Sequence, residues 1–216
     1  LKPYKSVSLS GLPQLGQLFG MWGYELIQWI EPTVHIHKTS KQDLPDGIWM
    51  FMDKVLIFDQ VKRLITAVAY GDLTEGVDPE KAYEIALKQI NALQELMSVP
   101  LKPIKPLIWS SKGDKPLQSQ SNITRKEFEH NVKIAKEYIR KGDDFQLVIS
   151  QKLETSVPQK PFELYRSLRM VNPSPCMAFF DFGDWQLIGS SPEVMVKAQK
   201  TEQGIKASLR PIAGTR

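Results

Sequence analysis

The sequence predicts an α+β fold, and three observations lead to that prediction. The composition, 42% hydrophobic and 24% charged among 216 residues, is that of a globular chain long enough to bury a sizeable core. Two segments carry helix signals, with apolar residues spaced three and four apart. Short β-rich runs separated by brief connectors accompany both segments. Helices followed by several strands with short turns favour a layered α+β arrangement.

The first region, residues 1–97, opens with a glycine-rich stretch and continues into a hairpin. Glycines are dense between Gly16 and Glu25, which favours close backbone approach or bulged strands. The runs Lys54–Asp59 and Leu64–Tyr70 are rich in β-forming residues, and only four residues connect them. This spacing predicts an antiparallel hairpin.

A helix is expected after Asp78. The Asp78 carboxylate can accept the first free backbone N–H groups, and Pro79 is tolerated at the first helical position. The apolar residues of this helix form one stripe: Ala82, Ile85, Ala86, Ile90, Leu93 and Leu96. Residues 98–121 then contain four prolines, which exclude a helix. We predict a Pro/Lys/Ser linker there, with Ile108 and Trp109 as candidate anchors.

The third region, residues 122–216, begins with another helix signal. Thr124 and Glu127 form a capping box, and Gly142 is placed to end the helix in a left-handed conformation. Its expected buried stripe is Phe128, Val132, Ala135, Tyr138 and Ile139. The remaining expected elements are a strand over Phe145–Ser150, a helix over Pro161–Met170, a hairpin of Cys176–Phe182 with Trp185–Ser190, and strands over Glu193–Ala198 and Ile205–Pro211.

Charge and rare residue types exclude several classes of function. The net charge is only +4 and the lysines are scattered, so we predict no nucleic-acid binding. The single cysteine, Cys176, excludes an intrachain disulfide and indicates a reducing compartment. His35 and His37 would share one face of a strand, but no third ligand is near, so we predict no metal site in this chain.

The sequence also predicts no association with a membrane. The longest apolar stretch, Leu15–Ile30, contains Gln17, Glu25 and Gln28, and it is too short to span a bilayer. No signal peptide opens the chain, which begins at Leu1 rather than at methionine. Because the chain ends inside a motif described next, we expect it to be incomplete at both ends.

Five motifs follow one another from residue 121 to the end of the chain. They read S-N-I-T-R-K-E-F at 121–128, G-D-D-F-Q-L-V-I-S-Q at 142–151, L-Y-R-S-L-R-M-V-N-P-S-P-C-M-A-F-F-D-F at 164–182, I-G-S-S-P-E at 188–193 and R-P-I-A-G-T-R at 210–216. This series resembles the chorismate-utilising enzymes, and among them most closely component I, the large subunit, of anthranilate synthases. A weaker resemblance to the family's N-terminal region covers Gly16–Glu25 and Val55–Asp59.

The resemblance implies a fold and a domain organisation. The fold has layered β-sheets with helices packed outside. Residues 1–97 would be part of the family's N-terminal region, and residues 122–216 would be the first part of its chorismate-binding domain.

The resemblance also implies a reaction on chorismate, the first committed step of tryptophan biosynthesis. Ammonia adds at C2 of the ring while the C4 hydroxyl departs, and elimination of pyruvate then leaves anthranilate. Because hydroxide is a poor leaving group, a carboxylic acid must protonate it as it departs. Such general acid catalysis raises the reaction rate by roughly 10²–10⁴. Glu193 matches the position of this acid in the family. By spacing alone, Glu193 is more simply an edge-strand glutamate that faces solvent.

Two positions indicate which branch of the family is resembled. Relatives that add water carry a lysine base where Gln146 stands, and a neutral amide cannot abstract a proton from water. Aminodeoxychorismate synthases usually carry a nucleophilic lysine where Ala213 stands, and alanine forms no covalent adduct. Both residues favour direct amination at C2, in which Gln146 positions the nucleophile or the substrate. Alternatively, Gln146 is a strand amide that pairs with a neighbour.

Two further groups of residues match binding positions in the family. Gly214 and Thr215, beside Ala213, match a pair that contacts chorismate. Pro175, Cys176 and Met177 match a segment that binds tryptophan as feedback inhibitor, although the family commonly has an aromatic residue at the position of Cys176. The alternative for this segment is a rigid turn into a core strand.

The resemblance implies partners that this chain cannot supply. The family's Mg²⁺ ligands lie after the P-I-A-G-T motif and are not in these residues, so we expect the chain to be inactive by itself. A glutamine amidotransferase subunit would deliver the ammonia, in the cytoplasm or in a plastid stroma. Two alternatives remain: an aminodeoxychorismate synthase component I, and a non-catalytic tryptophan-binding module.

Overall fold

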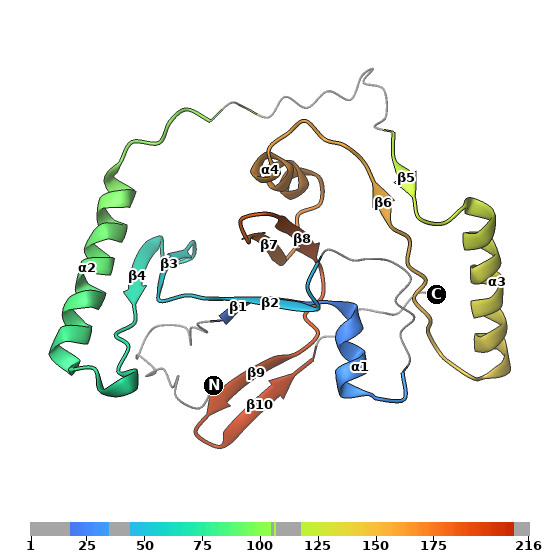
Figure 1. Ribbon diagram of the computed structural model, residues 1–216, viewed down its shortest axis with the longest axis horizontal. Helices are drawn as coiled ribbons and strands as arrows, with labels where there is room; N and C mark the ends of the chain where they lie inside the picture. The colour runs from blue at the N-terminus through green and yellow to red at the C-terminus, as the bar shows by residue number, and fades with distance from the viewer. Residues whose placement is uncertain (1–17, 35–43, 105, 107–117, 210–216) are drawn as a thin grey trace. The chain divides into compact units, whose positions relative to one another are not determined.

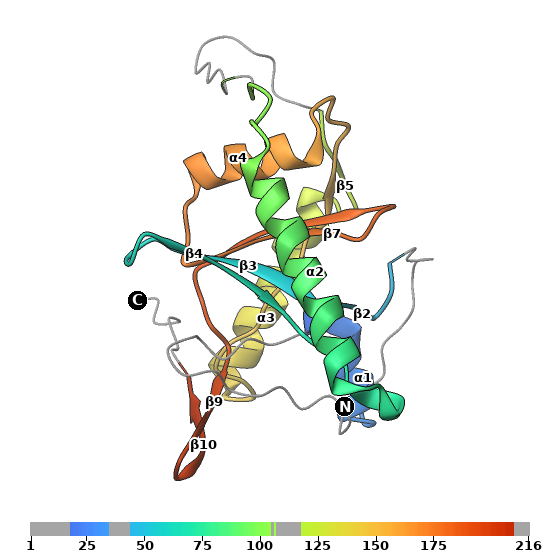
Figure 2. The ribbon, with the colours of Figure 1, turned by 90° about the vertical axis from the view of Figure 1, so that its left-hand side faces the viewer.

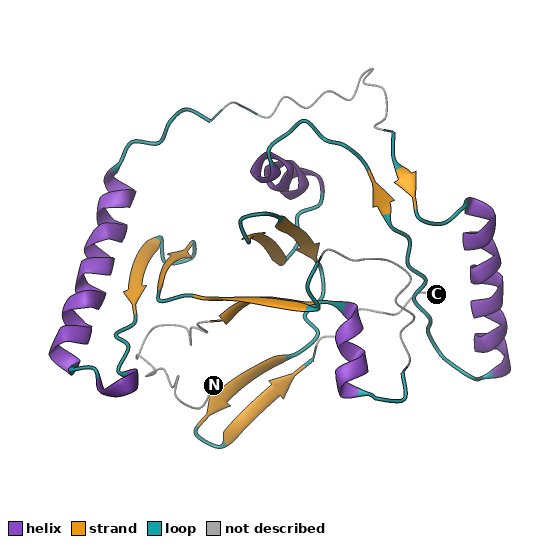
Figure 3. Ribbon diagram, in the orientation of Figure 1, coloured by secondary structure: helices purple, strands orange, loops and turns teal. Residues whose placement is uncertain are grey.

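The polypeptide divides into two units, Leu1–Ile104 and Lys105–Arg216. The computed structural model describes residues 18–34, 44–104, 106 and 118–209. In both units helices accompany antiparallel pairs of strands, as Figure 3 shows by colour. This mixture confirms the predicted α+β class. None of the described helices combines the length and the apolar character needed to cross a membrane.

The first unit begins with a pair of strands whose backbones lie very close together. Strand β1 (Leu18–Trp22) pairs antiparallel with β2 (Gly47–Phe51), so that Gly20 lies opposite Trp49. A Cβ atom on Gly20 would lie 2.7 Å from the Trp49 Cα and closer still to the Ile48 carbonyl oxygen. Only glycine fits this position, as the glycine-rich stretch predicts. Between the strands lie the short helices η1 (Tyr24–Leu26) and α1 (Ile27–Ile30).

The predicted hairpin of the first unit is confirmed. Strand β3 (Lys54–Asp59) pairs with β4 (Leu64–Ala69) in a register that sets Asp59 opposite Leu64. The Asp59 Oδ1 atom accepts the backbone N–H of Val61 at 3.0 Å and that of Lys62 at 2.9 Å. The carboxylate therefore organises the connector between the two strands. A short helix, η2 (Thr74–Gly76), follows β4.

Helix α2 (Pro79–Ser98) packs against this hairpin (Figures 1 and 2). Asp78 caps it as predicted, because its Oδ1 atom accepts the Glu80 backbone N–H at 3.4 Å. The buried hydrophobic side chains of the described residues are those of Ala82 and Ala86 on α2 and of Val68 on β4. The predicted stripe is thus correct at its two alanines, whereas Ile85 and Leu96 remain 47% and 65% exposed.

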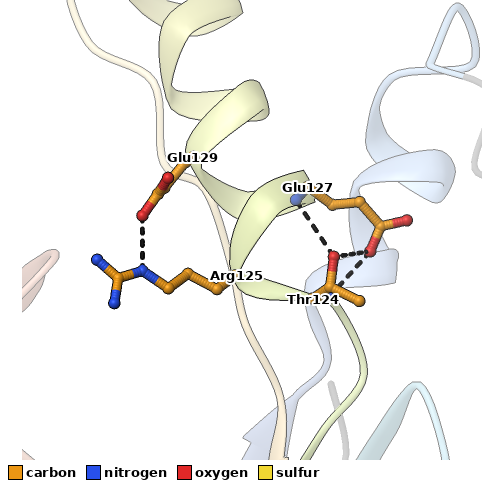
Figure 4. A network of polar contacts seen from close by, with 4 residues as sticks. All are labelled: Thr124, Arg125, Glu127 and Glu129. Carbon is orange, nitrogen blue, oxygen red and sulfur yellow. Dashed lines mark hydrogen bonds and ion pairs between the residues drawn. The ribbon is translucent and has the colours of Figure 1, made fainter.

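The second unit opens with helix α3 (Arg125–Lys141), and both of its ends form as predicted. The Glu127 backbone N–H donates to the Thr124 Oγ1 atom at 3.3 Å, and the Glu127 carboxylate accepts the Thr124 N–H at 2.9 Å (Figure 4). Gly142 ends the helix with φ 82°. None of the predicted stripe residues is buried: Phe128, Val132 and Ala135 are half-buried, and Tyr138 and Ile139 are exposed.

The predicted strand over Phe145–Ser150 is not present. In the described part of the chain, regular pairing in this region is limited to two residues each of β5 (Gln120–Ser121) and β6 (Leu153–Glu154). Phe145 is 98% exposed. A β-rich pattern shows that a segment can form a strand, but only a partner strand satisfies its backbone N–H and C=O groups.

Helix α4 (Pro161–Val171) packs on the second predicted hairpin, formed by β7 (Cys176–Asp181) and β8 (Gln186–Ser191) (Figure 1). The predicted helix and the two predicted strands of this hairpin are each correct to within one residue at both ends. The Phe179 ring on β7 lies 5.4 Å from the Phe162 ring and 5.8 Å from the Tyr165 ring of α4, measured between centroids. These aromatic contacts fix α4 on one face of the hairpin.

The last two strands match their predictions to different degrees. Strand β9 (Lys197–Thr201) begins four residues later than the predicted strand over Glu193–Ala198. It pairs with β10 (Gly204–Ser208), which begins within one residue of the predicted strand over Ile205–Pro211. Pro211 lies outside the described residues. Glu193 lies in the loop between β8 and β9.

Candidate active site

Glu193, the predicted acid, lies in a turn at the end of β8. Ser191 is the last residue of that strand, and Pro192 separates it from Glu193. The Ser191 hydroxyl donates to the Glu193 carbonyl oxygen at 3.1 Å, and the Glu193 N–H donates back to the same hydroxyl oxygen at 3.4 Å. The turn therefore holds the backbone of Glu193, while its side chain is exposed.

The strand register brings the predicted tryptophan-binding segment beside this turn. Cys176 lies opposite Ser191, and Met177 lies opposite Ser190. Cys176 and Met177 are half-buried, whereas Pro175, just before the strand, is exposed. Two groups of residues that the sequence assigns to separate sites are thus neighbours across one hairpin.

The start of the same segment is tied to β8 by a side chain. The Ser190 hydroxyl donates to the Asn172 carbonyl oxygen at 2.7 Å. Between Asn172 and Pro175, the Ser174 hydroxyl oxygen is buried and has no hydrogen-bond partner among the described residues. A buried polar atom in this state is uncommon and is a natural contact for a bound polar group.

Gln146 lies in the irregular chain between α3 and β6. Its backbone N–H donates to Asp144 Oδ1 at 3.3 Å, and the Phe145 N–H donates to the same oxygen at 2.7 Å. The Gln146 side chain is exposed. Gln146 and Glu193 therefore belong to different segments of the second unit.

The remaining predicted site residues cannot be placed. Ala213, Gly214 and Thr215 lie outside the described residues, as do His35 and His37. Among the residues that are described, no group of three or more His, Cys, Asp or Glu side chains is arranged to hold a metal ion.

A hydrogen-bonded carboxylate lies at the turn of the hairpin. Asp181 has its pKa lowered by a hydrogen bond from the Gln186 side chain and by one from the Gly183 backbone N–H. Beyond the opposite end of the hairpin, the Glu193 side chain is exposed.

Two residues at the site escaped the sequence interpretation. Ser191 and Asp144 both hold the backbone of a predicted catalytic residue two positions later. The signal was present in each case, because Ser and Asp side chains characteristically accept the N–H two residues ahead. The S-S-P-E and D-D-F-Q strings could therefore have been interpreted as turns.

Comparisons with known proteins show the family to which the chain belongs. A family model described as chorismate binding enzyme matches residues 1–216. The anthranilate synthase component 1 of Synechocystis is 49% identical over 100% of this chain and 44% of its own length. The proteins of the same name from Acetivibrio thermocellus and Pseudomonas putida are 37% and 34% identical, each over 99% of this chain and 42% of their own length. The chain thus spans less than half the length of these relatives.

A solved structure shares the fold. The crystal structure of anthranilate synthase component I from Streptococcus pneumoniae matches 91% of this chain and 43% of its own, with a TM-score of 0.75 and 32% sequence identity. Sequence and fold therefore lead to the same group of proteins.

Proposed function

Because the chain belongs to the family of chorismate-binding enzymes, we propose that it carries out the reaction of anthranilate synthase component 1 together with the further polypeptide that its relatives contain. The substrates are chorismate and ammonia, and the products are anthranilate, pyruvate and water. The observation that carries this proposal is the 49% identity to the Synechocystis relative across the entire chain. The reaction belongs to tryptophan biosynthesis, and we place it in the cytoplasm, in keeping with the chain's single cysteine.

In this mechanism Glu193 acts as the general acid. Ammonia attacks C2 of chorismate, the ring double bonds shift, and the C4 oxygen takes a proton from Glu193 as it leaves as water. Elimination of pyruvate then makes the ring aromatic. The turn at the end of β8 supports this role, because it holds the backbone of Glu193 beside the last residue of a paired strand.

Gln146 and the P-I-A-G-T motif give the reaction its specificity. The Gln146 amide can orient ammonia or the ring by hydrogen bonds, and it cannot activate water as a lysine base does. Ala213 removes the covalent route through a lysine adduct. Gly214 and Thr215 would receive a carboxylate of chorismate. A glutamine amidotransferase subunit would supply the ammonia.

Magnesium is not assigned to residues of the described chain. We propose that Mg²⁺ takes part in the reaction and that its ligands belong to the further polypeptide that the relatives contain. Among the described residues, no group of three or more His, Cys, Asp or Glu side chains is arranged to hold a metal ion. No step of the mechanism above passes through the metal.

We also propose that Pro175, Cys176 and Met177 contribute to a tryptophan site that inhibits the reaction. Two features support this assignment: the buried Ser174 hydroxyl, which lacks a partner among the described residues, and the position of the segment across the hairpin from the Glu193 turn. In an active enzyme, Met177→Ala should raise the tryptophan concentration needed for half-inhibition. Unchanged inhibition would remove the segment from this role.

Product analysis of a hybrid enzyme tests the proposed function. In this hybrid, the chain replaces the matched region of the Synechocystis relative, and the unmodified relative is the positive control. We expect anthranilate from chorismate and ammonia. Formation of 4-amino-4-deoxychorismate would assign the chain to the aminodeoxychorismate synthases. A folded hybrid that forms neither product would contradict the proposal.

A further inference from the structure

Two adjacent serines at the end of β8 hold two different segments of the chain. The Ser191 hydroxyl bonds both the carbonyl oxygen and the N–H of Glu193, at 3.1 and 3.4 Å. The Ser190 hydroxyl bonds the Asn172 carbonyl oxygen at 2.7 Å. Successive side chains of a strand point to opposite faces, which explains why neighbours serve different partners.

The backbone at Glu193 is held by three successive constraints. Ser191 is fixed by its pairing with Cys176 at the end of the β7–β8 ladder. Pro192 restricts its own φ angle and keeps the preceding residue extended. The Ser191 hydroxyl then closes the turn onto both backbone polar groups of Glu193. The direction in which the Glu193 side chain leaves the backbone is therefore set before any substrate binds.

We propose that Ser191 is a positioning residue for Glu193, a role that rests on the proposed function of Glu193 as the acid. Proton transfer to the departing C4 oxygen requires the carboxyl within hydrogen-bond reach of that oxygen. Displacement of a reacting group by about 1 Å can lower turnover by up to about 10². Ser191 itself needs no contact with chorismate, because it acts through the Glu193 backbone.

Substitutions of the two serines in the hybrid enzyme separate this role from a general structural one. Ser191→Ala should lower kcat about tenfold with little change in the KM for chorismate, because the acid is used in the transition state and not in substrate binding. Ser191→Thr keeps the hydroxyl and should restore kcat to within about threefold. Ser190→Ala is the matched control, since it removes the same group one residue away, and its kcat should stay within about twofold.

A double substitution decides whether Ser191 acts through Glu193. If it does, adding Ser191→Ala to Glu193→Gln costs no further turnover, because the group being positioned has already been removed. An equal tenfold loss in both backgrounds would overturn the proposal, and so would a Ser191→Ala kcat within twofold of the unmodified hybrid. Near-normal turnover in Glu193→Gln alone would instead overturn the acid role of Glu193. The two proposals therefore fail by different results.

Discussion

Replacing Gly20 by alanine should disrupt the pairing of β1 with β2. The new Cβ atom would lie 2.7 Å from the Trp49 Cα and closer to the Ile48 carbonyl oxygen, both of which are backbone atoms of the paired strand. Because backbone in a ladder cannot move aside as a flexible side chain can, we place the cost in the upper part of the overpacking range, about 2–3 kcal/mol. The free energy of opening the β1–β2 pair should fall by that amount.

Amide hydrogen exchange of the 216-residue chain measures this change strand by strand. A loss of about 2–3 kcal/mol corresponds to exchange about 30- to 150-fold faster at the β1 and β2 amides. Gly189→Ala is the control, because nothing lies within 4 Å of the Cβ atom it would add to β8. Its stability should be unchanged or slightly raised. Unaltered β1–β2 exchange in Gly20→Ala would refute the close approach of these two backbones.

The remaining structural predictions concern α3 and α4. Thr124→Ala should destabilise α3 by about 1 kcal/mol, against a few tenths for the exposed Arg125→Ala control, as measured by exchange of the α3 amides. The Thr124 hydroxyl and N–H lower the pKa of Glu127, so the contribution of the box is complete above the ordinary glutamate pKa, about 4.3, and is lost as pH falls through the lowered value. Loss of α3 helicity on raising the pH would contradict this sign. Phe179→Ala should release α4 at a cost of about 2 kcal/mol, whereas Phe180→Ala, on the opposite face of β7, should leave the α4 amides protected.

Local signals in the sequence were sufficient for much of the fold. The capping box at Thr124, the left-handed Gly142 and the cap at Asp78 each depend on residues within one helical turn, and each is confirmed. The two hairpins that begin at Lys54 and at Cys176 are also confirmed. In each of them a short connector favours pairing between the two strands that it joins. Each of these elements is therefore determined by residues close to it in the sequence.

The incorrect predictions involve interactions with distant residues. Residues 145–150 have a strand pattern but no strand to pair with in the described part of the chain. The α3 stripe has the period of a buried face, yet none of its members is buried by the described residues. Two interactions that the sequence did not predict also join residues far apart in the chain. They are the pairing of β1 with β2 and the 2.6 Å hydrogen bond from Gln89 Nε2 to Asp53 Oδ2. Periodicity identifies an apolar face without identifying what covers it.

In the candidate site, too, some features were predicted from the sequence and others were not. The resemblance assigns roles to Glu193 and to the Asn172–Met177 segment. The strand register pairs Cys176 of that segment with Ser191, two residues before Glu193. The local environment of Glu193 was predicted incorrectly, because a strand was expected to begin at Glu193, whereas the Ser191 hydroxyl holds Glu193 in a turn. Side-chain hydrogen bonds of this kind compete with a ladder and are not visible in a β-propensity pattern.

Glu193→Gln in the hybrid enzyme is the most direct test of the proposed mechanism. Glutamine has nearly the same shape but cannot give a proton to the departing oxygen. We expect kcat to fall by about 10² or more, with unchanged circular dichroism and with chorismate still bound. Turnover within about threefold of the unmodified hybrid would show that another group protonates the C4 oxygen, and it would contradict the account given for this chain.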